Sequence, residues 1–401
     1  MATPSKIPGD LIVDGDITAD NLQGFPLVTV GPSAAQYTTI ADAVANSGAF
    51  GFYIKGAVTE VADIEFSVDG DYSFFFAPNA SDDLSTYKFN ILNGVTANIK
   101  IYDGSLSYAY GSAQNMITYT GTGSGNLYVN GVLITNASTV DGCYVNGTPG
   151  AAGPTQTFIG CTVQLPDQDL CGLQFSAGVG MDLTFVSGGS SCRGAITASR
   201  GQFAAIKFKG AAWSSGVIAS FGASNVNGLL VTSETGTPSV RVWITSPSTL
   251  QGVYAEGTSS FVIILLANAS ITNFDTGAAG TIFLASSSGF SAISNGVCVQ
   301  NLISSNGAQV KFSNVRFTSS VGIEAVGSLF SNCSFDGDNQ IRANNVHLSN
   351  VSAGVPGGVG GNTFTITTGF GGCSIIGSNS EVIPVDSSGL LTNTLFANAL
   401  W

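Results

Sequence analysis

Short runs of alternating apolar and polar residues fill most of this chain. Residues 127–134, 181–186 and 240–244 have the two-residue period of β-strands. Glycine, asparagine, serine and threonine separate the runs, and Asn-Gly and Asp-Gly pairs, which accept positive φ, recur at the joins. The pattern predicts an all-β protein built from many short strands.

The runs also repeat along the chain. The segment 312–317 (Phe-Ser-Asn-Val-Arg-Phe) returns 18 residues later at 330–335, and Gly-Cys-x-Val at 142–145 returns at 160–163. A residue that recurs at one phase predicts a parallel β-solenoid, in which each coil places it over its predecessor about 4.8 Å away. We therefore expect Cys143 and Cys161 to stack as thiols on neighbouring coils. Because the same turn pairs also close hairpins, a trimeric β-sandwich or β-prism fibre is the alternative fold.

Residues 39–46 break the strand pattern. Ile40, Ala43 and Val44 have helical spacing, Thr38 or Thr39 is suited to the N-cap, and Gly48 is suited to end the helix in the left-handed conformation. We expect a short helix that covers the open N-terminal end of the solenoid, whose unpaired strand edge would otherwise invite aggregation.

The solenoid is expected to span residues 31–352, between two segments of different character. Residues 1–30 contain an extended acidic stretch, which indicates an attachment arm. Residues 353–401 are dense in glycine and end on apolar residues. Because an apolar terminus needs a partner surface, we interpret this segment as a cap that joins three copies of the chain around Leu395, Phe396, Leu400 and Trp401.

Composition and charge exclude several classes of partner. Lys and Arg number 12 against 25 Asp and Glu, so the net charge is −13, and only 9% of residues are charged. This balance argues against nucleic acid, which requires clustered cations. The longest apolar run, 261–267, is too short to cross a bilayer, which takes about 20 residues, so no membrane insertion is expected.

The residues that bind metals or activate nucleophiles are scarce. His347 is the lone histidine, and the seven cysteines form no Cys-x-x-Cys pair. We therefore expect no Cys/His metal site and no bound cofactor, and we interpret the cysteines as reduced core residues.

Two N-terminal stretches carry a family resemblance. Residues 36–45 and 52–60 resemble the entrance of the pectin-lyase-like right-handed parallel β-helix family, which opens with a capping helix and a first strand. Residues 12–19 are similar to a segment common in bacteriophage tail fibres and tailspikes. The resemblance implies a homotrimeric virion protein, made in the host cytoplasm and extracellular once assembled, whose arm joins other tail or adaptor proteins.

Such a protein attaches a virion to its host, and the aromatic residues suggest how. Trp213, Trp243 and Tyr254 lie among small residues, and their rings combine an apolar face with a polar tip suited to sugars. We predict that they bind a host surface polysaccharide, and packing in the core or between the copies of a trimer is the alternative, because a solenoid core also uses aromatic residues. Pectin methylesterases share the same entrance, but their signature motifs are absent here.

A polysaccharide depolymerase, either a hydrolase or a lyase, is the alternative function. Hydrolysis needs two carboxylates about 5 to 9.5 Å apart. If residues 165–170 are extended, Asp167 and Asp169 lie about 6.6 Å apart on one face, and Asp182 reaches them from the next coil. Because acids at turns are well hydrated, we favour binding without cleavage. A structural fibre or capsid decoration protein is the third hypothesis.

Overall fold

The computed structural model describes most of the chain between residues 27 and 397. The described ranges are 27–146, 155–175, 178–198, 200–210, 212–214, 216–232, 239–244, 248–256, 259–265, 269–277, 281–284, 290–298, 300–304, 309–318, 322–324, 326–336, 339–342, 344–353, 364–366, 372–376 and 395–397. The expected arm, apart from residues 27–30, and most of the expected C-terminal segment lie outside them.

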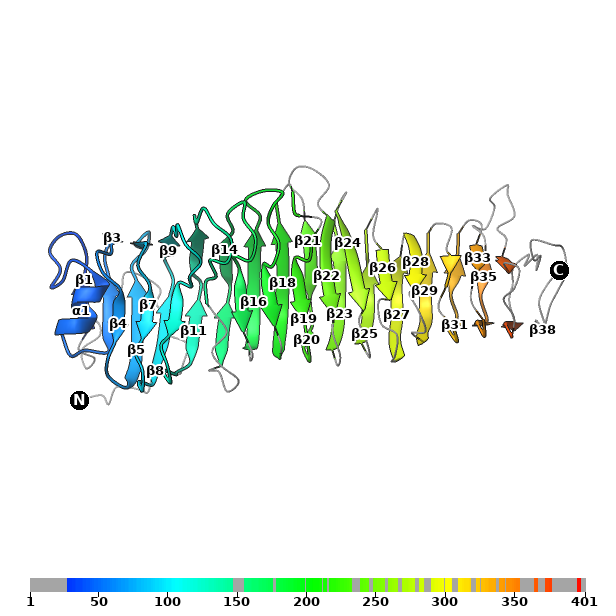
Figure 1. Cartoon of the computed structure of the whole chain (residues 1–401), viewed down its shortest axis with the longest axis horizontal. Coiled ribbons are helices and arrows are strands. Elements are labelled where there is room, and N and C mark those ends of the chain that lie inside the picture. The colour runs from blue at the N-terminus through cyan, green and yellow to red at the C-terminus, as the bar shows by residue number, and fades with distance from the viewer. Residues whose placement is uncertain are drawn as a thin grey trace, which may run out of the picture.

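The molecule is a right-handed parallel β-helix that forms a long rod (Figure 1). Its largest sheet comprises β1 (Leu27–Val30), β2 (Gly51–Ile54), β3 (Ala57–Thr59), β5 (Gly70–Phe76), β6 (Ser81–Ser85), β8 (Ala97–Tyr102), β9 (Ser105–Tyr108), β11 (Leu127–Asn130), β12 (Leu133–Asn136), β13 (Gln156–Ile159), β14 (Cys161–Gln164), β16 (Gly178–Val186), β18 (Gly201–Lys209), β20 (Asn225–Val226), β21 (Leu229–Thr232), β23 (Ser248–Ala255), β25 (Ala269–Asp275), β27 (Phe290–Cys298), β29 (Gln309–Phe317), β31 (Leu329–Ser331), β32 (Ser334–Phe335), β34 (His347–Ser349), β35 (Ser352–Ala353), β37 (Ser374–Ile376) and β38 (Leu395–Ala397).

Three further sheets close the coils on the other side. One comprises β4 (Ile64–Phe66), β7 (Phe89–Ile91) and β10 (Ile117–Tyr119). The next comprises β15 (Leu173–Phe175), β17 (Ile196–Ala198), β19 (Ala219–Phe221), β22 (Ser239–Ile244), β24 (Ser260–Leu265), β26 (Thr281–Leu284) and β28 (Gln300–Ser304). The third comprises β30 (Gly322–Ile323), β33 (Asn339–Ile341) and β36 (Phe364–Ile366).

The core is a set of side-chain stacks that run along the rod. The Phe52 and Phe74 rings stack 5.1 Å apart, and those of Phe312 and Phe330 stack 4.9 Å apart. Phe330 in turn aligns with Leu348 in the next coil. Inward and outward side chains alternate along each strand, so one residue type at one phase builds a continuous apolar column.

The predicted 18-residue period holds only near the C-terminal end. Phe312 aligns with Phe330, 18 positions later, but Leu127 aligns with Gln156, 29 positions later. The strands keep their length while the turns between them differ, because a turn on the surface can grow without disturbing the core. The Cys143–Cys161 register predicted above is therefore wrong. Cys161 aligns with Leu183, and the Val145 N–H donates to the Gly172 carbonyl, which places Cys143 beside Cys171.

The largest sheet bends at one corner in every coil. At this corner Asn295, Asn314, Asn332 and Asn350 all have positive φ, between 50° and 56°. The Asn314 amide donates to Asn295 Oδ1 at 3.0 Å, and the Asn350 amide donates to Asn332 Oδ1 at 2.7 Å. We call this column the corner; glycines such as Gly131 and Gly252 occupy it in earlier coils.

The predicted capping helix is present at the N-terminal end. Helix α1 (Ile40–Asn46) starts at Thr39, whose hydroxyl accepts the Asp42 N–H, and Gly48 follows it with φ +64°. Ile40 and Ala43 are fully buried, so α1 covers the end of the apolar column (Figure 1). At the other end, β37 and β38 continue the coils beyond the expected solenoid boundary at residue 352. No helix in the described part of the chain is long and apolar enough to cross a membrane.

Candidate functional site

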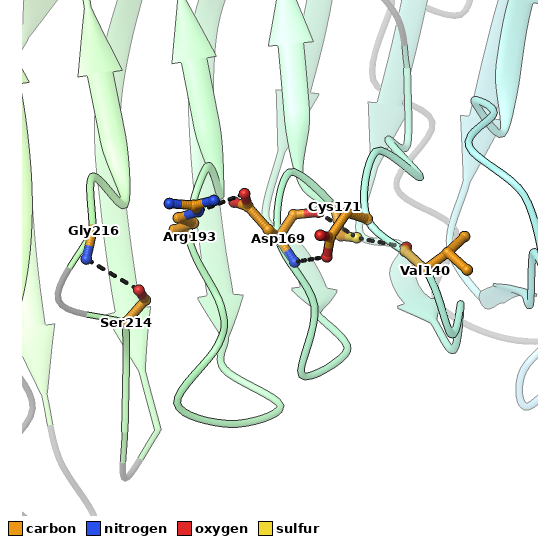
Figure 2. Close-up of polar contacts among 7 residues, drawn as sticks. Val140, Asp169, Cys171, Arg193, Ser214 and Gly216 are labelled. Carbon is orange, nitrogen blue, oxygen red and sulfur yellow. Dashed lines mark hydrogen bonds and ion pairs between the residues drawn. The ribbon is translucent and has the colours of Figure 1, made fainter.

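Asp169 lies at the centre of a polar cluster on the turns between strands (Figure 2). Its Oδ2 forms an ion pair with Arg193 Nε at 2.5 Å, and its own N–H donates to Asp141 Oδ1 at 2.7 Å. Arg193 and Asp141 belong to the coils on either side, so these contacts tie three successive turns together. The side chain of Asp169 is 12% exposed and that of Arg193 is 53% exposed.

The backbone around Asp169 is bent rather than extended. Leu170 has φ +53°, and the same place in the neighbouring coils is held by Gly142 and Gly194, which also have positive φ. The extended conformation expected for residues 165–170 is therefore not adopted. The bend exposes Leu170 and lets its N–H donate to the Arg193 carbonyl at 3.0 Å.

Asp167 is exposed and binds the turn of the next coil. Its Oδ1 accepts the Ser191 N–H at 2.7 Å. A Cβ at Gly189 would lie only 2.3 Å from the Asp167 Cγ, so the glycine leaves the space that the carboxylate fills. These contacts hold Asp167 against the 187–191 loop, while Asp169 is held by Arg193.

Asp182 lies apart from the other two acids. It is exposed at the corner, beside Ala205 in the next coil, and the pairing of Cys161 with Leu183 places it beside Gly160 rather than beside the turn after β14. Burial, and to a smaller extent the charge of Asp182, raises the pKa of Cys161 to about 11. The three predicted carboxylates therefore do not converge on one point.

The three predicted sugar-binding aromatics have different surroundings. Trp213 is 8% exposed and packs edge-on against Phe208 at 5.6 Å, so it belongs to the core. Trp243 on β22 is 39% exposed and Tyr254 on β23 is 48% exposed. Among the side chains that the structure describes, no aromatic ring stacks on either of them.

A second set of aromatic residues escaped the sequence analysis. Phe75, Tyr102 and Tyr128 face outward on β5, β8 and β11. The Phe75 and Tyr102 rings stack 4.9 Å apart and nearly parallel, and Tyr128 lies 5.6 Å from Tyr102. Because these ring faces cover one another, the column stabilises the coils and leaves mainly ring edges to solvent.

A buried pair of carboxyl groups was also missed. Both oxygens of Glu60 accept backbone N–H groups at the start of α1, from Ile40 at 2.6 Å and Ala41 at 3.0 Å. Asp82 is fully buried beside Glu60, and neither of its oxygens has a hydrogen-bond partner among the described residues. Burial, then the charge of Glu60, raises the pKa of Asp82 well above its ordinary value. The signal in the sequence was Asp82-Asp83 within a strand, since alternation turns one of two neighbours inward.

Metal-binding side chains do not cluster in threes anywhere in the described residues. The Asp141, Asp169 and Arg193 cluster is thus a network of ion pairing and hydrogen bonding within the protein. Of the three predicted sugar-binding aromatics, Trp243 and Tyr254 have side chains that are open to a ligand.

Comparison with known proteins gave one solved structure. No protein-family model matches the chain, and no curated protein matches it. The crystal structure of bacteriophage CBA120 tailspike protein 3 is similar with 14% identity and a TM-score of 0.23. The match covers 97% of this chain and 64% of the tailspike, so this chain spans less than two thirds of that protein's length. The solenoid is established by its own strand pairings.

Proposed function

We propose that this chain is a virion protein of the tailspike or tail-fibre type, which attaches the particle to a host cell by binding a surface polysaccharide. The observation that carries the proposal is the exposure of Trp243 and Tyr254 on the side of a long, sparingly charged rod. Ring faces that are open to solvent stack readily on the apolar faces of sugars. The Phe75 and Tyr102 rings cannot stack on a sugar in this way, because their faces cover each other.

The proposed assembly is a homotrimer attached through its N-terminal segment. Three copies that meet around the apolar residues of the last segment would cover these residues. Three parallel rods also present each binding face three times, so that weak single contacts add up through avidity. Residues 1–30 are proposed to join other tail proteins, which places the chain on the outside of the virion.

A depolymerase remains the second candidate because of one observation. Asp169 Oδ1 is buried and has no hydrogen-bond partner in the described part of the chain, although Asp141 is its neighbour on the adjacent coil. Cleavage of a glycosidic bond needs two carboxyl groups directed at the same bond. Here Asp167 accepts the Ser191 N–H and Asp169 pairs with Arg193, so each carboxylate is bound to the next coil. This arrangement favours binding over cleavage.

The test is retention of the purified protein on an array of bacterial surface polysaccharides. Trp243→Ala and Tyr254→Ala should each weaken binding about tenfold or more, since aromatic contacts dominate such interfaces. Phe50→Ala is the matched control, because Phe50 is also exposed (42%) but lies in the first coils. Failure of the native protein to bind any polysaccharide, or equal loss in the control, would contradict the proposal.

A further inference from the structure

The outward positions of the strands that follow the corner form one flat face along the middle of the rod. Strand pairing aligns Thr162 with Thr184, Thr184 with Lys207, Lys207 with Leu230, and Leu230 with Tyr254. A second row beside it runs through Val186, Lys209 and Thr232. We call these two rows the lysine face. The residues between them, such as Phe185 and Phe208, point into the core.

Positive charge is concentrated in this part of an acidic protein. Between residues 183 and 241 the sequence has five basic residues and one acidic residue, Glu234, against 12 and 25 in the whole chain. The five are Arg193, Arg200, Lys207, Lys209 and Arg241. Lys207 and Lys209 point outward from the same strand, about 7 Å apart.

Among the residues that the structure describes, neither lysine forms an ion pair with a carboxylate. The three ion pairs among the described residues involve Arg193, Arg316 and Arg342, and none includes Lys207 or Lys209. The nearest acids on this side of the rod are Asp182 at the corner beside Ala205, Asp275, which aligns with Tyr254 in the next coil, and Glu256, which continues the second row one coil beyond Thr232. Both ammonium groups are therefore available for negative charge from outside.

We propose that the lysine face binds a polysaccharide that carries acidic groups, such as uronate or sialate carboxylates. Lys207 and Lys209 would pair with the acidic groups, the threonine hydroxyls would hydrogen-bond neutral sugars, and Tyr254 would stack on a sugar two coils, or about 9.6 Å, from Lys207. The inference rests on the proposed function and names its substrate class.

The charge of the chain favours an acidic glycan over a neutral glycan as the ligand of the lysine face. The chain carries a net charge of −13, so its field repels an acidic polysaccharide everywhere except where the local sign is reversed. Binding of a neutral glycan would not require a patch of positive charge on this acidic protein. Nucleic acid is a poorer fit, because its backbone carries a charge every few ångströms and two lysines neutralise little of it.

The experiment measures binding of the full chain to an array of acidic and neutral bacterial polysaccharides, with single-stranded DNA as a further probe. The bound polysaccharides should be acidic, and binding should weaken as NaCl rises from about 0.05 to about 0.5 M. Lys207→Gln with Lys209→Gln should weaken binding roughly tenfold, whereas Lys207→Arg with Lys209→Arg should retain it. Lys311→Gln, at an exposed lysine on β29, is the matched control and should have no effect.

Each alternative result has a distinct meaning. If neutral polysaccharides are bound and the double glutamine variant binds them as well as the native protein, the lysine face is overturned while the proposed function stands. If DNA binds as tightly as any polysaccharide, the assignment to an acidic glycan is overturned. If no polysaccharide is bound, the proposed function fails and takes this inference with it.

Discussion

At the scale of single residues, the burial of the Asp82 carboxyl group beside Glu60 carries an electrostatic cost. Glu60 binds the first N–H groups of α1 through both of its oxygens, which satisfies donors that the helix start leaves open. Burial raises the pKa of Glu60, and it raises that of Asp82 well above its ordinary value. A proton on Asp82 removes one of two adjacent negative charges and allows that group to donate to Glu60.

This pair predicts a loss of stability as pH rises. Because the folded protein binds the Asp82 proton more tightly than the unfolded chain, its contribution is complete below the ordinary aspartate pKa of about 4 and is lost as pH rises through the raised value. Asp82→Asn should remove this dependence, so the variant gains in Tm over the native protein between about pH 5 and pH 9. Asp182→Asn, at an exposed carboxylate on β16 far from Glu60, is the control. Parallel Tm curves for native protein and Asp82→Asn would contradict the prediction.

The sequence predicted these residues unevenly. Thr39 as N-cap is confirmed, and so is the burial of the six cysteines whose side chains the structure describes. Local rules suffice to predict these features. An N-cap is recognised from the residues of its own helix, and the burial of the cysteines follows from the composition of the chain. The sequence analysis missed Asp82, Lys207 and Lys209. Their roles depend on which strands are neighbours, and this register cannot be predicted from the sequence because the turns differ in length.

At the scale of elements, the corner explains why asparagine recurs in the C-terminal coils. A side chain at positive φ is strained, and asparagine is among the residues that adopt this region most readily. The same amide also reaches the next coil, as the hydrogen bond from Asn350 to Asn332 shows. The asparagines and phenylalanines that repeat in the sequence therefore occupy the corner and the phenylalanine stacks beside it.

Substitutions of Asn332 separate these two contributions. Asn332→Ala should lower the free energy of unfolding by about 1 to 2 kcal/mol, because it introduces backbone strain and removes the amide contact. Asn332→Gly should cost less, because glycine adopts φ +53° without strain. Urea unfolding followed by circular dichroism measures both. An alanine variant as stable as the glycine variant would show that the corner imposes no strain.

The coils themselves were predicted, but their lengths were not. Alternating runs and the Phe312 repeat predicted parallel stacking, because identical phases on successive coils are needed to build a column. The interval of 18 residues was extended wrongly to Cys143 and Cys161. Surface turns of different length do not change which residues face inward, so the apolar pattern carries no information on them.

At the scale of the whole molecule, we expect a trimer. The rod carries little charge along its sides, which permits close packing of parallel copies. Light scattering of the purified chain should give about three times the 40.7 kDa of one copy, and the mass should persist on dilution. A dilution-resistant monomer would refute the trimer and with it the avidity expected from three binding faces.

The central claim is that the rod binds a surface polysaccharide without cutting it. The most direct measurement is the chain length of a polysaccharide that the protein retains, followed by size-exclusion chromatography with light scattering during incubation. The account predicts that the length stays constant, and that Asp167→Asn with Asp169→Asn leaves binding unchanged. Progressive shortening by the native protein that this double variant abolishes would contradict it and identify the chain as a depolymerase.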